Sequence, residues 1–558
     1  MYGSVSHSTT SASLRPPPSG SLSLRSRIVR ARAEDLAARG FLYAAAAMVI
    51  TVAAFALRLV LLHRYPFRED EAAYAYWALH GWFEDPMYLS VWPDKPPIYL
   101  WLLGAAFRFF GVSEASARWV NVAASTLTVP IAAAIGRRLW GNRTALIAAA
   151  VLALSPYAIA FGPTAYTDPV MVAAGLCAFC AAIYGRPIVA GLFLGMAIMT
   201  KQQGVLFVPL VLGALCLEQT SDTASVRRRL LSAGLLLFGL ATVGLPILYW
   251  DSLRWSVAPS PWDLSVRNYA ALSLLTPTFW PARLSLWAPL MFDLTSSWII
   301  WIWFAGLVTV ATVVTYQRTG SILAFLRSNT AAVLIAGWSI CFLCIHVVTT
   351  VQPWDRYLLP LAPMMALLAA WAAGKVSLTA RRMRELTLTA IGFLFLLTPA
   401  VQAAGGQISI GGDHGDYAGL PDAIGAVRQS SNKPLILYHR ALGTHYRFYL
   451  YGQTASAAQD GPIELRWFPS TVYLADNVAK TPYPRKLLII PDWAPLPDLN
   501  FHLSMRGLTL TKLARYGHFT LWEIAKEATP SCEWCTCRQS VPWREVAGIE
   551  AVATPANP

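Results

Sequence analysis

Long apolar runs separated by short polar loops recur along most of the chain. The first run, at about 41–62, is long enough to cross a membrane, which takes about 20 residues, and it lacks an obvious small-residue cleavage site. It therefore predicts a retained span. Ten further runs lie at about 115–136, 144–162, 169–184, 187–200, 204–217, 230–250, 297–315, 330–350, 357–374 and 387–403. The pattern predicts an α-helical polytopic membrane protein with about eleven transmembrane helices.

Basic residues gather in alternate loops, and this indicates the orientation. If the N-terminus is cytoplasmic, the inner loops contain Arg137, Arg138, Arg143, Arg186, Arg227, Arg228, Arg229, Arg318, Arg327, Lys375, Arg381, Arg382 and Arg384. The first outer loop, 63–97, contains Glu69, Asp70, Glu71, Glu84, Asp85 and Asp94 instead. The apolar stretch 98–110 is short for a span, and counting it would invert every later loop. We interpret it as an interfacial helix.

The two ends of the chain differ from this apolar part. Residues 1–40 are rich in Ser, Pro and Arg and predict a flexible basic cytoplasmic tail, and 41–403 form the transmembrane domain. The segment 404–528 is more polar and predicts a small extracytoplasmic α/β domain. Within it we expect a helix at 420–429 and strands or short apolar elements at 434–439, 471–475 and 486–491.

Composition agrees with a membrane protein. Hydrophobic residues make up 56% of the 558 residues and charged residues 13%, whereas soluble proteins are nearer ~25% charged. This excludes a soluble enzyme, a disordered chain and a secreted disulfide scaffold. The net charge is +14, from 44 Lys and Arg and 30 Asp and Glu. Because the basic residues lie in short loops, orientation explains this excess and no nucleic acid partner is needed.

The cysteines fall into two groups. Five lie inside apolar runs, where cysteine behaves as a small buried hydrophobic residue. The tail 529–558 contains Cys532, Cys535 and Cys537 in a CxxCxC spacing. Three thiols resemble an incomplete zinc site, but a disulfide with one cysteine left over and an incidental tail are alternatives.

The first outer loop contains the most informative polar residues. Asp70 and Tyr74 share a face if the segment is helical, and a partly desolvated Asp70 is a candidate general base. A solvated acidic loop is the alternative. Lys95 follows Asp94 and precedes two prolines, which favour an extended backbone. Its ammonium group suits a phosphate at headgroup depth, with ordinary snorkelling as the alternative.

Three later outer loops add candidate residues. Asp168 is either a helix cap before Pro169 or a second carboxylate in the outer cavity. Lys201, in the sequence TKQQG, is either a phosphate ligand or part of a polar turn. Arg356, beside Tyr357, suits bidentate phosphate binding, with pairing to Asp355 or lipid headgroups as alternatives. All these groups are expected on one membrane face, as transfer from a lipid phosphate donor requires.

The motifs REDEAAYA, DKPPIYLWL, FGVSEASARW, TD, TK and RYLLPLAP follow in this order over about residues 50–365. This order resembles the GT-C superfamily of polyprenyl-phosphate-sugar glycosyltransferases. The branch that it resembles contains the protein O-mannosyltransferases and the lipid A aminoarabinose transferases (glycosyltransferase family 39/83-like). The resemblance implies a GT-C fold.

The resemblance also implies roles for particular residues. Asp70 corresponds to the catalytic base, with Glu71 supporting it and Tyr74 lining the site. Lys95 corresponds to the lysine that contacts the lipid-linked phosphate, and Asp94 stands where relatives often have Glu. Asp168, Arg356 and Tyr357 match further active-site positions, and Arg118 matches a family arginine of less clear role.

The expected function follows from these matches. We expect transfer of a hexose or pentose from a polyprenyl-phosphate donor to a hydroxyl of a lipid, glycan or protein on the outer face, with inversion. No cofactor is expected to be obligatory, although Asp70, Glu71, Asp94 and Asp168 could hold a divalent cation. Because a MIR-type insertion is lacking, we expect a bacterial inner membrane location. A transporter or flippase is the alternative, but such proteins usually place polar sites near the midplane and often have repeated halves.

Overall fold

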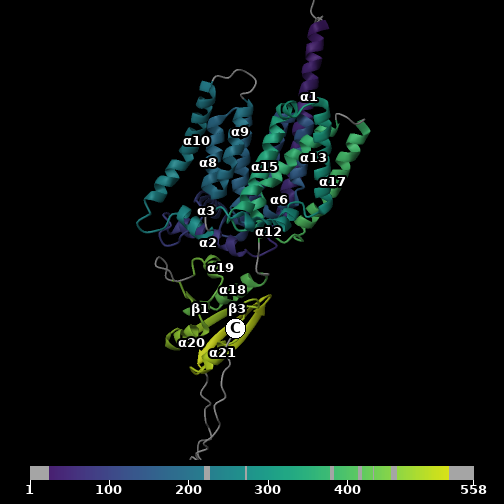
Figure 1. Ribbon diagram of the computed structural model, residues 1–558. Coiled ribbons are helices and arrows are strands. Elements are labelled where there is room, and N and C mark those ends of the chain that lie inside the picture. The colour runs from purple at the N-terminus through teal and green to yellow at the C-terminus, as the bar shows by residue number, and fades with distance from the viewer. Residues whose placement is uncertain are drawn as a thin grey trace, which may run out of the picture.

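The computed structural model describes residues 24–218, 226–269, 273–377, 382–411, 417–431, 433–453 and 461–526, with the backbone alone at 24–39, 377 and 382–391. A bundle of helices forms one part of the molecule, and a small α/β domain lies beyond one end of it (Figure 1). The bundle and its loops comprise α1 (Leu24–Leu59), α2 (Glu69–Phe83), α3 (Ile98–Phe110), α4 (Glu114–Trp140), α5 (Asn142–Ala153), α6 (Pro156–Phe161), α7 (Asp168–Ile183), α8 (Pro187–Thr200), η1 (Gln202–Phe207), α9 (Val208–Glu218), α10 (Val226–Ser252), α11 (Pro261–Tyr269), η2 (Pro277–Phe279), α12 (Trp280–Asp293), α13 (Trp298–Thr319), α14 (Ile322–Ser328), α15 (Thr330–Val348), η3 (Asp355–Leu358), α16 (Leu361–Ser377) and α17 (Arg382–Ala404).

Six stretches of the described residues are helical, long enough and apolar enough to cross a membrane. They are Gly40–Leu59, Glu114–Trp140, Val226–Ser252, Trp298–Thr319, Thr330–Val348 and Asp355–Val376. Shorter apolar helices lie at Ile98–Phe110, Asn142–Ala153, Asp168–Ile183, Pro187–Thr200, Gln202–Leu217 and Gly392–Ala404. The predicted polytopic helical fold is confirmed, whereas the number of eleven spans stays a prediction because several of these helices are short.

The predicted span 144–162 is divided into α5 and α6, and the sequence explains where. Pro156 lacks a backbone N–H and begins the second helix, while the Ser155 hydroxyl accepts from the Ala158 N–H. The guanidinium of the fully buried Arg58 donates to the carbonyl oxygens of Leu152 and Ala153 at 3.3 and 3.4 Å. These helix-terminal carbonyls would otherwise lack partners.

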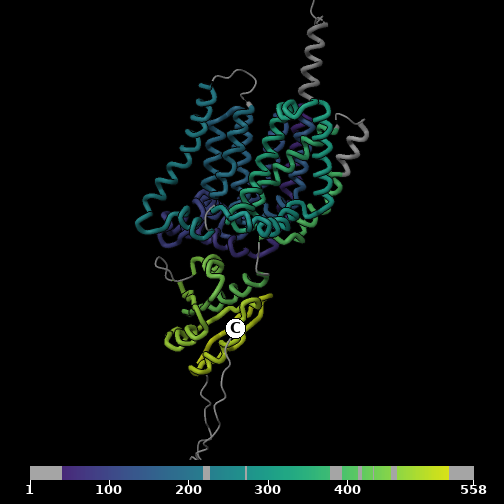
Figure 2. The backbone as a smooth tube through the Cα atoms, viewed as in Figure 1, coloured from purple at the N-terminus to yellow at the C-terminus, as the bar shows by residue number. Residues whose placement is uncertain are grey.

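Two glycines let α8 and α10 approach each other closely. A Cβ atom at Gly191 would lie 2.1 Å from the Leu236 carbonyl oxygen, and one at Gly239 would lie 2.2 Å from the Ile188 carbonyl oxygen. Small residues are a common means of close helix packing in membranes. Together the two helices form one side of the bundle, as the tube in Figure 2 shows.

The C-terminal domain is a five-stranded sheet in the order β2-β1-β3-β5-β4, with β1 parallel to β2 and β3 and with β5 antiparallel to β3 and β4. Helices cover both faces, because alternate strand residues contribute to two separate apolar clusters. The elements are α18 (Leu420–Gln429), β1 (Leu435–His439), α19 (Gly443–Tyr449), β2 (Ile463–Trp467), α20 (Thr471–Lys480), β3 (Arg485–Pro491), α21 (Leu499–Ser504), β4 (Leu508–Tyr516) and β5 (Phe519–Lys526).

Most of the elements predicted for this domain are present. The helix at 420–429 and the strands at 434–439 and 486–491 correspond to α18, β1 and β3. The stretch 471–475 is the first half of α20 and not a strand. The Ser470 hydroxyl caps this helix by accepting from the Tyr473 N–H at 3.2 Å, and Leu474 and Val478 lie buried one helical turn apart.

A correction also applies at the N-terminal end. Helix α1 begins at Leu24, inside the segment predicted to be a flexible tail, because Arg, Ala, Leu and Glu are good helix formers there. Residues 1–23 lie outside the described part of the chain. So does the cysteine tail, and the three interpretations of Cys532, Cys535 and Cys537 stay open.

Helix α19 docks the C-terminal domain on the first loop of the helical part. The His445 Nε2–H donates to the Phe67 carbonyl oxygen at 3.0 Å, and the Phe448 ring meets the Phe67 ring edge-on at 5.0 Å. The Tyr449 hydroxyl donates to Glu114 and accepts from the Phe67 N–H. Phe67 lies just before α2, so this contact fixes the helix on which Asp70 lies.

We expect acid to weaken this contact. Burial lowers the pKa of His445 to about 4 from its ordinary 6.5, because the second ring nitrogen is buried without a partner and cannot readily accept a proton. Burial lowers the pKa of His439 in the same way. The neutral rings favour the folded form, so their contribution is complete above about pH 6.5 and is lost as the pH falls toward about 4. Hydrogen exchange of α19 at about pH 7 and about pH 5 tests this, and equal protection at both values would contradict it.

Candidate active site

Three carboxylates at the end of the bundle near the C-terminal domain each pair with a cation. The Asp70 Oδ2 atom lies 2.5 Å from the Arg356 guanidinium, Asp94 lies 2.8 Å from the Lys95 ammonium, and Asp168 lies 2.5 Å from the Lys201 ammonium. The first and third pairs join residues from separate motifs, whereas Asp94 and Lys95 are neighbours in one motif.

Asp70 is the most accessible of the three carboxylates. Its side chain is 41% exposed, compared with 9% for Asp94 and 1% for Asp168. It lies in the first turn of α2, where the helix dipole favours a negative charge. Because a general base must be reached by its substrate, Asp70 fits that role better than the other two.

Aromatic rings surround the Arg356 guanidinium beside its pair with Asp70. The guanidinium lies 5.0 and 4.9 Å from the ring centres of Tyr166 and Trp354, and the Arg356 side chain is 6% exposed. The neighbouring Asp355 accepts from the backbone N–H groups of Arg356 and Gly411. Asp355 therefore anchors the connection to the C-terminal domain through backbone groups, whereas the Arg356 guanidinium reaches Asp70.

Lys95 belongs to a small buried network. Its ammonium donates to Asp94 and to the Tyr269 hydroxyl at 2.8 and 3.1 Å, and that hydroxyl donates to Asp94 at 2.7 Å. Burial alone would raise the pKa of Asp94, but the Lys95 charge and these hydrogen bonds hold it below its ordinary value. Tyr269 comes from α11, a segment for which the sequence suggested no role.

Asp168 is buried. The prediction of a second carboxylate facing the outer cavity implied a more accessible side chain. It is the first residue of α7, with Thr167 at the cap position, and its carboxylate accepts from Lys201. The Lys201 ammonium also lies 4.0 Å above the centre of the Tyr357 ring. Asp168 thus does not serve as the helix cap, and its carboxylate contacts Lys201 instead.

Two tyrosines connect the three pairs. Tyr357 lies close enough to Asp70, Asp94 and Asp168 to interact electrostatically with all of them. Tyr74, which is buried on α2, interacts in the same way with Asp70, Asp94 and Arg356. Separate segments of the chain therefore meet in one polar cluster, to which both tyrosines belong.

A largely apolar cavity of about 520 Å³ adjoins this cluster. Lys95, Lys201, Tyr269 and Tyr357 line part of it, and the apolar side chains of Ile198, Val205, Leu206, Val266, Ile345 and Val351 line much of the rest. A hydrocarbon chain suits the apolar walls, and an anionic group suits the two ammonium groups. The cavity therefore has the chemistry of a site for a lipid phosphate.

The wall also contains His346 and Gln203, which the sequence analysis did not identify. The Gln203 amide nitrogen lies 3.0 Å from His346 Nε2 and donates to the Tyr357 carbonyl oxygen at 2.9 Å. This contact holds the backbone beside Arg356. Gln203 is part of the TKQQG sequence, and the polar interruption of an apolar run could have identified it. A single His inside an apolar span gives little indication of function.

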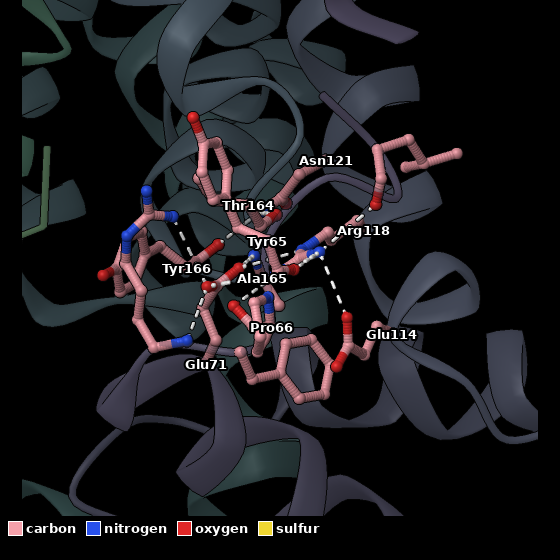
Figure 3. Close-up of polar contacts among 12 residues, drawn as sticks. Tyr65, Pro66, Glu71, Glu114, Arg118, Asn121, Thr164, Ala165 and Tyr166 are labelled. Atoms are coloured by element: carbon pink, nitrogen blue, oxygen red, sulfur yellow. Dashed lines mark hydrogen bonds and ion pairs between the residues drawn. The ribbon is translucent and has the colours of Figure 1, made fainter. Parts of the chain in front are cut away.

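Glu71 belongs to a different network from Asp70 (Figure 3). It is fully buried, pairs with Arg118 at 3.3 Å and accepts from the Ala165 N–H at 2.8 Å. Arg118 also donates to the carbonyl oxygens of Tyr65 and Pro66 at 2.7 and 3.1 Å. Burial would raise the pKa of Glu71, but the charges of Arg118 and Arg68 hold it below its ordinary value. The network connects α2, α4 and the loop before α7. Glu71 and Arg118 therefore hold in place the helix on which Asp70 lies, without lining the site themselves.

Within the described ranges, no three His, Cys, Asp or Glu side chains lie together as metal ligands would. The four carboxylates suggested for a cation are all engaged by Lys or Arg. A divalent ion would compete with these cations for the carboxylates.

Comparisons with known proteins bear on the fold. Residues 94–250 match the dolichyl-phosphate-mannose-protein mannosyltransferase family. No curated protein matches the sequence. The crystal structure of ArnT from Cupriavidus metallidurans in the apo state superposes with a TM-score of 0.58 at 15% identity, covering 87% of this chain and 98% of ArnT. The structure of ArnT bound to undecaprenyl phosphate gives 0.56 over the same coverage and at the same identity. The fold is therefore the GT-C fold that the motifs predicted, of the type found in ArnT.

Proposed function

We propose that this protein transfers a sugar from a polyprenyl phosphate to a hydroxyl group of an acceptor. The observation that carries this proposal is the meeting of three carboxylate–cation pairs with an apolar cavity. Such a site offers a base for the acceptor, cations for the phosphate and a channel for the lipid. The related fold of ArnT, solved with undecaprenyl phosphate, supports this choice of donor.

The lipid would lie in the cavity of about 520 Å³, with its phosphate near Lys95 and Lys201. Arg356 would turn from Asp70 toward the phosphate as the donor binds, which would release the Asp70 carboxylate. The three cations would stabilise the negative charge that builds on the phosphate as it leaves. This predicts that the donor binds before the acceptor.

The chemical step is a displacement at the anomeric carbon. Asp70 accepts the proton of the acceptor hydroxyl, and the oxygen of that hydroxyl forms a bond to the anomeric carbon. The bond from that carbon to the phosphate oxygen breaks, and its electron pair stays on the polyprenyl phosphate. Attack opposite the leaving group inverts the anomeric centre.

We propose the remaining features on the same grounds. The C-terminal domain and the site would face the outside, because the basic loops lie at the other end of the bundle. The location would be a bacterial inner membrane, and the acceptor a lipid, glycan or protein.

The three cations supply charge that a metal could otherwise supply, so activity should survive a chelator. Loss of activity that one divalent cation restores would contradict this.

Replacing Lys95 by Gln should weaken donor binding. Loss of a charge-assisted contact to phosphate corresponds to about 10- to 100-fold in affinity. We expect a rise of that size in KM for the donor, measured in detergent with excess acceptor. The matched control is Lys512→Gln, which removes an exposed lysine from β4. An unchanged KM in the Lys95→Gln variant would contradict the placement of the phosphate.

The test of the proposed function uses protein reconstituted in lipid vesicles. A panel of radiolabelled polyprenyl-phosphate sugars is offered together with native envelope membranes as acceptor. Transfer of label to a new molecule supports the proposal and identifies the sugar. If no donor reacts, but labelled lipid moves between the leaflets only when folded protein is present, the flippase alternative is correct instead.

A further inference from the structure

A second cavity, of about 260 Å³, lies at the end of the bundle farthest from the C-terminal domain. It is formed where α4, α7, α9 and α16 end and where α15 begins. Leu139, Trp140, Ile183 and Leu217 form an apolar part of its wall. Because these residues lie at the ends of membrane helices, the cavity is at headgroup depth in the leaflet opposite the active site.

The charged residues that line this cavity are both cations, Arg138 on α4 and Lys375 on α16. Among the described residues, no carboxylate lines it. Lys375 is half-buried, and the charged group that acts on it is Arg318, which has the same sign. Two cations in one partly apolar wall favour an anion in the cavity that they line.

The first turn of α15 adds hydrogen-bond donors. Thr330 and Ala331 line the cavity, and N–H groups in the first turn of a helix have no partner within that helix. The preceding Asn329 occupies the cap position, but its side chain does not cap the helix. Its amide nitrogen donates to the Phe325 carbonyl oxygen at 3.0 Å, and its amide oxygen accepts from the Trp371 indole at 3.3 Å. The helix end is therefore open to an external anion.

We propose that this cavity binds the phosphate of an anionic phospholipid. The phosphate would lie between Arg138, Lys375 and the start of α15, and the glycerol and upper acyl chains would contact Trp140, Leu139 and Leu217. Basic pockets between membrane helices suit such headgroups. A free phosphate shares the anionic chemistry, but it would leave the apolar wall uncovered. The site lies apart from the proposed sugar transfer and does not depend on it.

The test is native mass spectrometry of the full chain in detergent. Phosphatidylglycerol and phosphatidylcholine with the same acyl chains compete for the protein, and the bound lipid is counted. We expect the wild type to prefer phosphatidylglycerol roughly 30-fold, from about two cationic contacts. The double variant Arg138→Gln/Lys375→Gln should lose this preference. The control Arg143→Gln/Arg186→Gln removes two exposed arginines outside the cavity wall and should keep it.

A second cavity variant shows whether a lost lipid preference reflects the site or misfolding of the first variant. Thr330→Glu places a carboxylate in the first turn of α15, where it favours the helix but repels a phosphate. It should melt at or above the wild-type temperature and also lose the lipid preference. A preference that survives in both cavity variants would overturn the proposal, as would its equal loss in the control. Inorganic phosphate that displaces the lipid at micromolar concentration would overturn the assignment to a lipid.

Discussion

Replacing Asp70 by Asn should reduce sugar transfer by about 10²- to 10⁴-fold while leaving donor binding intact or tighter. The amide cannot accept the proton of the acceptor hydroxyl. It also no longer holds Arg356, which lies 2.5 Å from the carboxylate in the donor-free arrangement, so the guanidinium is more available to the phosphate. The measurement is kcat for transfer together with the dissociation constant for the donor lipid.

The matched control is Glu69→Gln, because Glu69 is the exposed neighbour of Asp70 on the same helix. It removes the same charge from the same loop and should leave kcat within about twofold of wild type. If only the loss of a negative charge from the loop mattered, kcat would fall equally in the two variants. If Asp70→Asn kept its kcat, or if it lost donor binding together with activity, the assignment of the base would be wrong.

Replacing Arg118 by Met should destabilise the fold more than any substitution at the exposed or half-exposed ion pairs of the C-terminal domain. It leaves the fully buried Glu71 without its main cation and removes three hydrogen bonds to carbonyl oxygens of the loop before α2. Breaking a buried ion pair from one side typically costs about 3–5 kcal/mol. We expect a large fall in melting temperature and poor recovery of folded protein.

The double variant Glu71→Gln/Arg118→Met separates charge from packing. The side-chain amide oxygen that Glu71→Gln introduces can still accept from the Ala165 N–H, and the fully buried charge at position 71 is removed. The double variant should therefore melt above the single Arg118→Met variant. If the two melted at the same temperature, lost packing would explain the effect, and the charge argument would fail. The surface control is Arg485→Gln, which breaks a half-exposed pair with Glu523 and should change little.

The sequence alone predicted the helical membrane architecture and most of the residues that form the cluster. Apolar run length and motif order were sufficient for Asp70, Lys95 and Arg356, because each lies in a polar loop between long apolar segments. The pairing of these residues could not be predicted. Asp70 and Arg356 are 286 positions apart, and no local pattern joins them.

Two further cases show where local reasoning stops. Tyr269 donates to Asp94 across 175 positions from a short helix outside all of the motifs, so nothing marked it in advance. Glu71 and Asp70 are adjacent and of similar chemistry, yet successive residues on a helix point in different directions. One pairs with Arg118 inside the protein, and the other is partly exposed at the site. The difference depends on Arg118, which reaches Glu71 from α4 in the folded protein.

The central claim is that the sugar is transferred by cleavage of its bond to the phosphate oxygen beside Lys95 and Arg356. The most direct measurement uses a polyprenyl-phosphate sugar carrying ¹⁸O in the oxygen that joins sugar to phosphorus, reacted with purified wild-type protein. We expect all of the ¹⁸O to be recovered in the polyprenyl phosphate and none in the sugar product. Recovery of ¹⁸O in the sugar would show attack at phosphorus, and no turnover of any donor by folded protein would exclude glycosyl transfer.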